Sequence, residues 1–309
     1  MYLSFINGNI LQKFSQDKYN IIYYPQNNLF DYSLMANDEY NYFIFGNNQK
    51  DYHSANVIDL PQDYISLYNY NLSITNNIIG YTTNNLKHLH LNTIIATHSY
   101  KPNYIKKEDA LLINKRLTKE IKIFFSDRAK ESWGINENTR VIKYGIPEVF
   151  NIETKQVDRK DVLVLNYENM PHNQQLYQAI KNEGYSCDIS SSCTDSSLKD
   201  INNKFNEYKV CIDLADHNIF NLICSIAAGC SAVSIKTPML HYDYSGVNGL
   251  FLVDSISSVV SQIKSIIDSS DDGQSKHNSA TALNTFNYNN FKNSMKTLIT
   301  QANSEAFLL

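Results

Sequence analysis

The sequence predicts an α/β protein with two domains whose sheets are mostly parallel. Short apolar runs alternate along the chain with stretches of helical periodicity, which is the order of parallel strands joined by helices. The chain has 309 residues, enough to form two separate cores. A polar stretch without apolar periodicity at 148–160 lies between the two series of elements, and we expect it to be the linker.

In the first half of the chain, strands are predicted where short apolar runs lie between turn residues. These runs are 2–6, 19–24, 42–45, 55–60, 92–97, 121–125 and 140–144. A helix is expected at 105–118, and a second helix begins after the capping residue Ser126 and runs through Gly134. The sequence leaves open whether 74–81 is a strand that is followed by a helix at 82–89.

The second half is organised around 210–253. The predicted elements of this stretch are strands at 210–214, 232–235 and 250–253 and a helix at 219–227. The helix has one apolar face, because apolar side chains repeat at helical spacing: Ile219, Leu222, Ile223, Ile226 and Ala227. Gly229 then permits the left-handed turn that ends a helix. This order predicts parallel pairing of the strands.

Further elements are predicted on both sides of this stretch. Before it lie a strand at 161–165, an amphipathic helix at 174–182, a serine-rich loop at 187–197 and a short helix at 198–208. After it lie a helix that is capped by Asp254 or Ser255 and runs to 267, a polar loop at 269–279 and a final helical region at 280–306.

Composition and motifs exclude several classes of protein. The net charge of -4 and the pI near 6.1 argue against a broad nucleic-acid surface. The five cysteines form no CxxC pair and no zinc pattern. No apolar stretch approaches the roughly 20 residues of a membrane span, and no signal peptide is visible. We therefore expect a cytoplasmic protein without a membrane span. No GxGxxG follows a strand, and P-loop, GxSxG and HExxH motifs are absent.

Three segments of the second half resemble the donor half of GT-B glycosyltransferases: Ser225-Ile-Ala-Ala-Gly229, Ala232-Val-Ser and GVNGLFLV at 246–253. The segments FFSDRAKESWG and RVIKYGIP, which contain Tyr144 and Gly145, are similar to the end of the acceptor domain of that family. The resemblance implies two Rossmann-like domains with a cleft between them. The acceptor-type domain would span 1–150 and the donor-type domain 151–285, and a C-terminal helix at 286–309 would pack back toward the first domain.

The resemblance implies site residues in the first domain. A glycine-containing loop is expected to face the cleft at Asn7-Gly8-Asn9, because glycine lets backbone approach a ligand closely; a plain Asn-Gly turn is the alternative. His98 follows the strand at 92–97, at the end of the strand where α/β sheets bind ligands. In the family a histidine near this point lies close to the transferring sugar or the acceptor; the alternative is a surface histidine. Lys143 and Gly145 are further candidates for donor binding.

In the second domain, several groups that the family uses are replaced. The family places a glycine-arginine pair after the first strand of this domain and a lysine a few residues later. Here the positions hold Asn166-Tyr167 and His172 or Asn173. Of two acidic residues on the key helix, Asp216 stands for the first, and the second falls on Cys224. The helix start remains as a phosphate site through its backbone amides, with three candidate residues: Asn218, Ile219 and Asn221.

The leading hypothesis is a divergent glycosyltransferase that moves a sugar from a nucleotide-sugar donor to an acceptor hydroxyl. His98 would orient sugar or acceptor, and Asp216 would bind donor hydroxyls. The donor is a co-substrate, and neither a cofactor nor a metal is expected. The acceptor is a glycan, a protein or a modified nucleic acid, and the oligomeric state stays open. The alternatives are a non-catalytic GT-B-like module that binds a glycan or a partner protein, a doubly wound domain without transferase activity, and another doubly wound nucleotide-binding enzyme.

Overall fold

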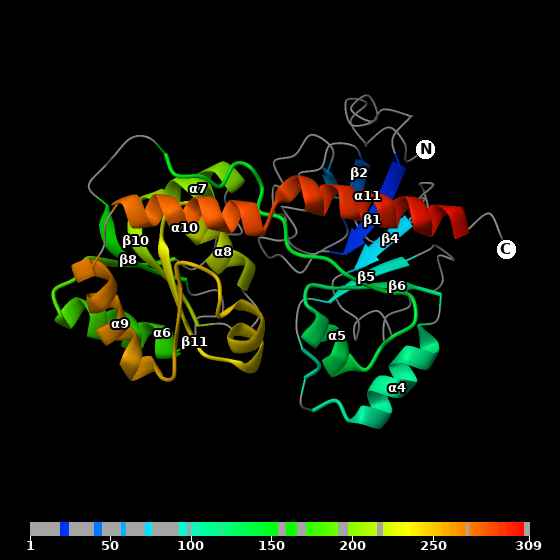
Figure 1. Ribbon diagram of the computed structural model, residues 1–309, viewed down its shortest axis with the longest axis horizontal. Helices are drawn as coiled ribbons and strands as arrows, with labels where there is room; N and C mark the ends of the chain where they lie inside the picture. The colour runs from blue at the N-terminus through cyan, green and yellow to red at the C-terminus, as the bar shows by residue number, and fades with distance from the viewer. Residues whose placement is uncertain are drawn as a thin grey trace, which may run out of the picture. The chain divides into compact units, whose positions relative to one another are not determined.

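A computed structural model describes the chain at 19–24, 40–44, 57–59, 72–75, 93–97, 100–102, 104–117, 119–153, 159–165, 171–190, 197–214, 219–269 and 272–305 (Figure 1). By their contacts, Met1–Ile142 and Lys292–Leu309 form one compact unit and Lys143–Phe291 form another. We call them the N-terminal unit and the C-terminal unit. The division at Ile142 lies earlier in the chain than the linker that the sequence predicts.

The N-terminal unit contains a parallel sheet of seven described strands in the order β3-β2-β1-β4-β5-β6-β7. Their bounds are β1 Tyr19–Tyr24, β2 Tyr40–Ile44, β3 Val57–Asp59, β4 Leu72–Thr75, β5 Thr93–Thr97, β6 Ile121–Phe124 and β7 Thr139–Val141. Two helices follow the later strands, α4 at Lys107–Arg116 and α5 at Asp127–Trp133. The predicted strand at 2–6 lies outside the described residues.

Helices α4 and α5 bury one face of this sheet. Ile95 and Phe124 from the strands pack with Ala110 of α4 and with Ala129 and Trp133 of α5. Ser126 caps α5 as predicted, since its Oγ accepts a hydrogen bond from the Ala129 N–H. This core packs the two helices on the part of the sheet formed by β5 and β6.

Lys122 is an exception among the buried residues of β6. Its side chain is fully buried, and its Nζ donates to the Leu117 carbonyl oxygen beyond the end of α4. Burial lowers the pKa of Lys122 below 10.5, although Glu120 and Glu137 act in the opposite direction. The charged lysine therefore weakens the folded state at neutral pH.

A pH-dependent stability difference is expected between the native chain and Lys122→Met. The unfolded chain binds more protons between the lowered pKa and 10.5, so the native protein gains stability as pH rises through this window. The gain is about 1.4 kcal/mol for each unit by which the pKa is lowered. Urea unfolding at about pH 7 and about pH 10 measures the free energy of unfolding of the native chain and of Lys122→Met. Lys115→Met, at an exposed lysine, is the control. If the stability difference between the native chain and Lys122→Met is the same at both pH values, the pKa of Lys122 is not lowered by burial.

The C-terminal unit contains a parallel sheet of five described strands in the order β12-β11-β10-β8-β9. The strands are β8 Lys160–Leu165, β9 Cys187–Ser190, β10 Tyr208–Asp213, β11 Ser231–Ile235 and β12 Leu250–Val253. The helices are α6 Pro171–Asn182, α7 Leu198–Asn206, α8 Ile219–Ala227, α9 Ile256–Ser269 and α10 Asp272–Thr285. A π-helix, η3, spans Leu240–Tyr244, and α11 spans Tyr288–Glu305. The predicted α/β class with mostly parallel sheets is confirmed.

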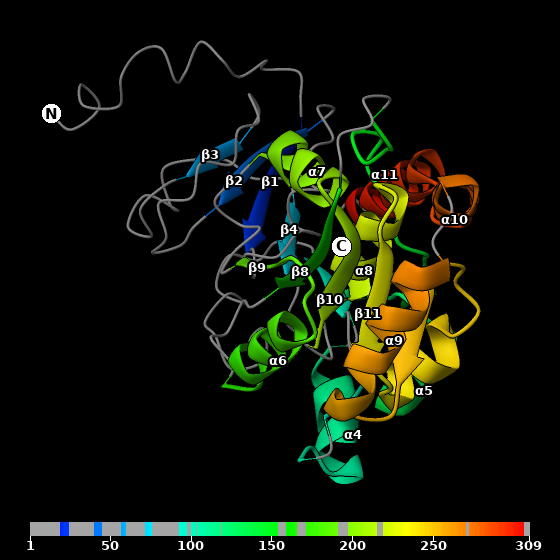
Figure 2. The ribbon, with the colours of Figure 1, turned by 90° about the vertical axis from the view of Figure 1, so that its left-hand side faces the viewer.

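Helices cover both faces of this second sheet (Figures 1 and 2). The residues that face α6 and α9 are branched and fully buried: Val162, Val164, Val210, Ile212 and Val233. Helices α7 and α8 contact β10, and α10 packs on α8. Every residue of α8 is buried, which fits a helix that lies between a sheet and another helix. Gly229 ends α8 with φ at 91°, as the sequence predicts.

Two segments that the sequence analysis assigned to loops contain regular structure in their described residues. The serine-rich segment 187–197 begins with strand β9, and the polar segment 269–279 contains the start of α10. In α10 the polar residues Asn278 and Ser279 are themselves buried, and the Ser279 hydroxyl donates to the Ala227 carbonyl oxygen of α8. Small polar side chains thus form the contact between these helices, so an apolar pattern could not reveal it. The π-helix η3 was also not predicted.

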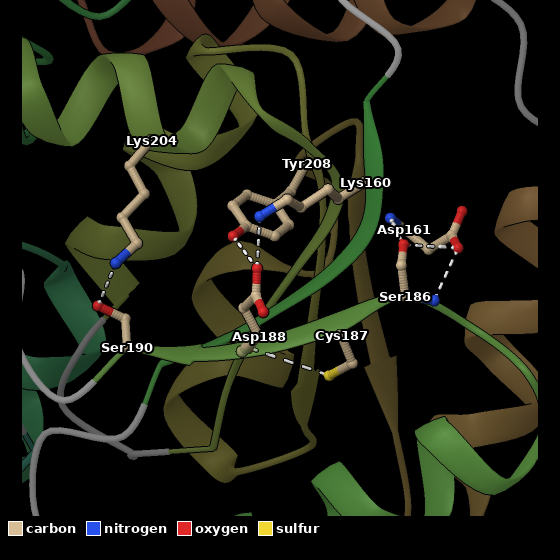
Figure 3. A network of polar contacts seen from close by, with 8 residues as sticks. All are labelled: Lys160, Asp161, Ser186, Cys187, Asp188, Ser190, Lys204 and Tyr208. Carbon is tan, nitrogen blue, oxygen red and sulfur yellow. Dashed lines mark hydrogen bonds and ion pairs between the residues drawn. The ribbon is translucent and has the colours of Figure 1, made fainter.

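Strand β9 is stabilised by polar partners on one of its faces (Figure 3). Cys187 and Ile189 point into the core. On the other face, Asp188 accepts hydrogen bonds from Lys160 Nζ at 2.8 Å and from the Tyr208 hydroxyl at 2.6 Å. The Lys160 contact is the main cause that lowers the pKa of Asp188. An edge strand with one polar face is therefore compatible with this sequence.

One cation joins the ends of two helices in the C-terminal unit. Arg159 donates to the carbonyl oxygens of Phe205 and Asn206 at the end of α7, and to that of Gly229 after α8 at 2.9 Å. The buried Cys230 thiol donates to the Phe205 carbonyl oxygen at 3.1 Å, and burial raises the pKa of this thiol to about 11. A cation at two helix C-termini is electrostatically favourable, and the neutral thiol is unreactive at physiological pH.

Candidate functional site at the carboxyl edge of the C-terminal sheet

The strand order places a topological switch point between β8 and β10. From β8 the chain moves outward to β9, and then it crosses back to β10 on the other side of β8. The helices that follow β8 and β10 therefore leave the sheet on opposite faces. In doubly wound sheets this arrangement opens a crevice at the carboxyl ends of the two strands, where ligands bind. Here those ends are Leu165 and Asp213.

Two helices begin at this switch point, α6 after β8 and α8 after β10. Neither has an acidic residue in its first turn. Helices α4, α5 and α7 carry acidic residues there, for example Glu108, Asp127 and Asp200, whereas α9 and α11 also carry none but do not begin at the switch point. Carboxylates in a first turn offset the partial positive charge of a helix N-terminus. The first turns of α6 and α8 leave that charge for an anionic ligand.

Buried amides connect the helix starts to the strand ends. Asn221, in the first turn of α8, donates from Nδ2 to the Asp213 carboxylate at 3.2 Å. Asn173, in the first turn of α6, donates from Nδ2 to the Leu165 carbonyl oxygen at 3.4 Å. The Ser234 hydroxyl of β11 donates to the Asp213 carbonyl oxygen at 2.6 Å. These contacts hold the two helix N-termini at the carboxyl edge of the sheet.

The structure therefore brings together part of the predicted donor site. Asn173, Ile219 and Asn221 lie in the first turns of α6 and α8, although the Ile219 side chain is buried and only its backbone can serve a ligand. Their contact with a donor stays a prediction. Five other predicted residues lie outside the described part of the chain: Gly8, His98, Asn166, Asp216 and Asn218. For His172, the structure describes only the backbone, which is part of α6.

Lys143 and Gly145, also predicted to bind the donor, lie at the start of the C-terminal unit. Lys143 is exposed. Gly145 is buried against α11, where an added Cβ would come within 2.4 Å of the Phe291 Cβ. The neighbouring Ile146 forms a parallel bridge with Asn287. Close packing against Phe291 thus accounts for a glycine at 145 without any ligand.

Sequence reasoning missed three polar residues at this edge. Asp213 and Ser234 are almost completely buried, and a signal for Asp213 existed, since it is a carboxylate at the end of an apolar run. Lys204 of α7 is the third; its Nζ donates to the Ser190 hydroxyl at 3.0 Å (Figure 3). Ser190 ends β9 and pairs with Leu165 at the end of β8. A cation is thus present one strand away from the switch point, where no pattern in the sequence indicates it.

The described part of the chain contains no group of three or more His, Cys, Asp or Glu residues that is arranged to hold a metal ion. Within the same residues, no helix has the length and apolar character to cross a bilayer.

In the N-terminal unit, β5 ends at Thr97, whose hydroxyl is buried and has no hydrogen-bond partner among the described atoms. Thr97 directly precedes His98 in the sequence, so the residue predicted to act in catalysis follows a strand that ends in a polar side chain.

No family model matches the chain, and no curated protein matches its sequence. Solved structures do match its fold over nearly its whole length. HepE from Anabaena, in complex with UDP and glucose, matches 92% of this chain and 100% of its own at a TM-score of 0.67 and 11% identity. Sucrose-phosphate synthase from Thermosynechococcus elongatus matches 92% of this chain and 99% of its own at a TM-score of 0.62 and 12% identity.

A glycosyltransferase from Rickettsia africae matches 93% of this chain and 99% of its own at a TM-score of 0.58 and 12% identity. These identities are low, so the likeness concerns the fold. It extends over both units, each of which contains a parallel sheet. The chain therefore has the fold of the GT-B glycosyltransferases, the family that its second-half segments resemble.

Proposed function

We propose that this protein is a glycosyltransferase that binds a nucleoside diphosphate sugar at the carboxyl edge of the C-terminal sheet. The observation that carries the proposal is the pair of helix N-termini at the switch point, α6 and α8, whose first turns contain no carboxylate. Two such N-termini suit a diphosphate, which carries negative charge on both phosphate groups. The complexes of HepE with UDP and with UDP-glucose support this class of ligand.

In the proposed reaction, the bond between the anomeric carbon of the sugar and the diphosphate oxygen breaks. A new bond forms between that carbon and an acceptor hydroxyl oxygen, the acceptor proton passes to a base, and the nucleoside diphosphate leaves. The amides at the starts of α6 and α8 would stabilise the charge that develops on the leaving diphosphate. Asp213 would hold Asn221 and with it the start of α8. Asp216 would bind donor hydroxyls, and His98 would orient sugar or acceptor.

Cys224 favours a second candidate function. The family places a carboxylate at this position to bind the ribose, whereas the Cys224 side chain is fully buried within α8 and cannot accept hydrogen bonds from a ribose. A chain that lacks this group fits a non-catalytic GT-B-like module that binds a glycan or a partner protein. The two candidates differ in whether the C-terminal unit binds nucleotides.

A carboxylate placed in the first turn of α6 is expected to weaken nucleotide binding. Gln174 is exposed there, so Gln174→Glu should leave the fold intact and should slightly stabilise the free protein through the helix dipole. The same charge should repel a bound diphosphate and raise the Kd for UDP or UDP-glucose roughly 2- to 5-fold at low ionic strength. Titration calorimetry measures the Kd, and thermal unfolding measures the stability.

Gln178→Glu is the matched control, because Gln178 is an exposed residue one turn further along the same helix. Its Kd should stay close to that of the native protein. Equal Kd values for Gln174→Glu and the native chain would place the phosphates away from α6. Absence of binding across a broad panel of nucleotide sugars would favour the non-catalytic module instead.

A further inference from the structure

The segment 104–112 of the N-terminal unit carries most of the markedly exposed large hydrophobic side chains of the described residues. Tyr104 is 78% exposed, Leu111 48% and Leu112 53%, and the fourth such residue is Tyr242 in the C-terminal unit. Tyr104 lies in the turn before α4, and both leucines lie in α4. Single exposed leucines are ordinary. Two adjacent exposed leucines, with an exposed tyrosine a few residues before them, are an unusual concentration of apolar side chains at the surface of one short segment.

Helix α4 is apolar on two sides. Ala110 of this helix and Leu117 just beyond it belong to the core formed with the sheet, and Ile113 packs against that core. Successive residues turn by roughly 100° around a helix of 3.6 residues per turn, so Leu112 points roughly 200° away from Ala110. The outward leucines are therefore not part of the stripe that attaches α4 to its unit. In Figures 1 and 2 α4 lies at the outside of that unit.

Basic residues surround the exposed leucines. All of the basic residues between 106 and 119 are exposed: Lys106, Lys107, Lys115, Arg116 and Lys119. The acidic residues in this range are Glu108 and Asp109, which lie in the first turn of α4. There they complement the helix dipole. The segment is thus net positive in a chain whose net charge is -4.

We infer that α4 docks the N-terminal unit on an anionic lipid surface. Leu111, Leu112 and Tyr104 would enter the boundary between head groups and acyl chains, while Lys107 and Lys115 would contact the lipid phosphates. A tyrosine suits this boundary because its ring is apolar and its hydroxyl is polar. The inference concerns where the protein acts and does not depend on the proposed reaction.

Two other occupants fit this segment less well. A second copy of the chain in a twofold contact would set this net positive segment against an identical net positive segment, and like charges across an interface are unfavourable. A soluble polyanion would use the lysines but would gain nothing from Leu111 and Leu112. The combination of exposed leucines and cations is what a membrane surface recognises.

Co-sedimentation with vesicles tests the inference on the full-length protein. One set of vesicles contains phosphatidylcholine alone, and the other is an equal mixture of phosphatidylcholine and phosphatidylglycerol. We expect binding to the anionic vesicles that weakens with added salt. The variants L111S/L112S and K107E/K115E should each lower the partition coefficient about 10-fold. The control K264E/K276E changes two exposed lysines of the C-terminal unit and should stay within about 2-fold of the native value.

The outcomes are distinct. No binding to anionic vesicles, equal binding to both vesicle types, or binding that L111S/L112S leaves unchanged would each overturn the inference. Sedimentation velocity without lipid distinguishes a lipid-docking surface from a dimer interface. A native dimer that L111S/L112S converts to a monomer would show that these leucines form an interface between two copies of the chain, which would overturn the inference. Circular dichroism and thermal unfolding of each variant check that the protein keeps its fold, which is expected since all four substituted residues are exposed.

Discussion

Ending the chain at Phe291 is expected to unfold the N-terminal unit and to leave the C-terminal unit folded. The truncation removes Lys292–Leu309, which belong to the N-terminal unit by their contacts. The lost part of α11 contains four buried apolar side chains: Met295, Leu298, Ile299 and Ala302. Burial of the three larger ones contributes roughly 5–8 kcal/mol, which is comparable with the total stability of a domain.

The single tryptophan makes this prediction specific to one unit. Trp133 is buried in α5 of the N-terminal unit, so its fluorescence should shift to the red when that unit unfolds. Limited proteolysis should then cut within 93–142 while 160–286 stays protected. A chain that ends at Glu305 keeps the whole of α11 and serves as control. An unchanged Trp133 spectrum in the shorter chain would show that the N-terminal unit is stable without α11.

Replacing Arg159 by leucine is expected to lower the free energy of unfolding of the C-terminal unit by roughly 2–4 kcal/mol. The change leaves three carbonyl oxygens without their cationic donor, those of Phe205, Asn206 and Gly229. Hydrogen bonds from a charged donor contribute about 1.5–3 kcal/mol each, and the half-buried position of Arg159 lets water replace part of this.

Urea unfolding of three variants measures the effect of Arg159. Arg159→Lys should lose an intermediate amount, because an ammonium group cannot reach all three carbonyls as the planar guanidinium does. Lys264→Leu removes an exposed cation from α9 of the same unit and should stay within about 0.5 kcal/mol of the native protein. An Arg159→Leu variant as stable as the native chain would mean that solvent satisfies the helix ends.

The sequence predicted well those elements whose apolar periodicity comes from burial of the segment itself. The apolar run at 250–253 became β12 with those bounds, and the helical repeat from Ile219 became α8. Strand β9 was missed because Asp188 and Ser190 are satisfied by Lys160, Tyr208 and Lys204. Those partners are distant in sequence, and single-segment periodicity contains no information about them.

In the candidate site, too, features that depend on local sequence could be predicted, and features that depend on distant contacts could not. The helix start at Ile219 and the place of Asn221 in it could be predicted, since they depend on local capping and periodicity. For Asp213 the sequence offers only its place at the end of an apolar run, because its contacts with Asn221 and with Ser234 of another strand depend on the fold. Donor binding by Gly145 stays a prediction, and the sequence could not indicate its packing against Phe291, which is far along the chain.

The position of β8 inside its sheet, between two other strands, has a consequence for the growing chain. β8 is the first strand of its sheet to be synthesised, yet it ends up between β9 and β10. Because both pairings are parallel, each must wait until an intervening helix has left the ribosome. Until then β8 exposes two unpaired edges and the apolar residues Val162 to Leu165. Such a strand is a template for mispairing with other chains, so the incomplete C-terminal unit is most open to aggregation before β10 has been synthesised.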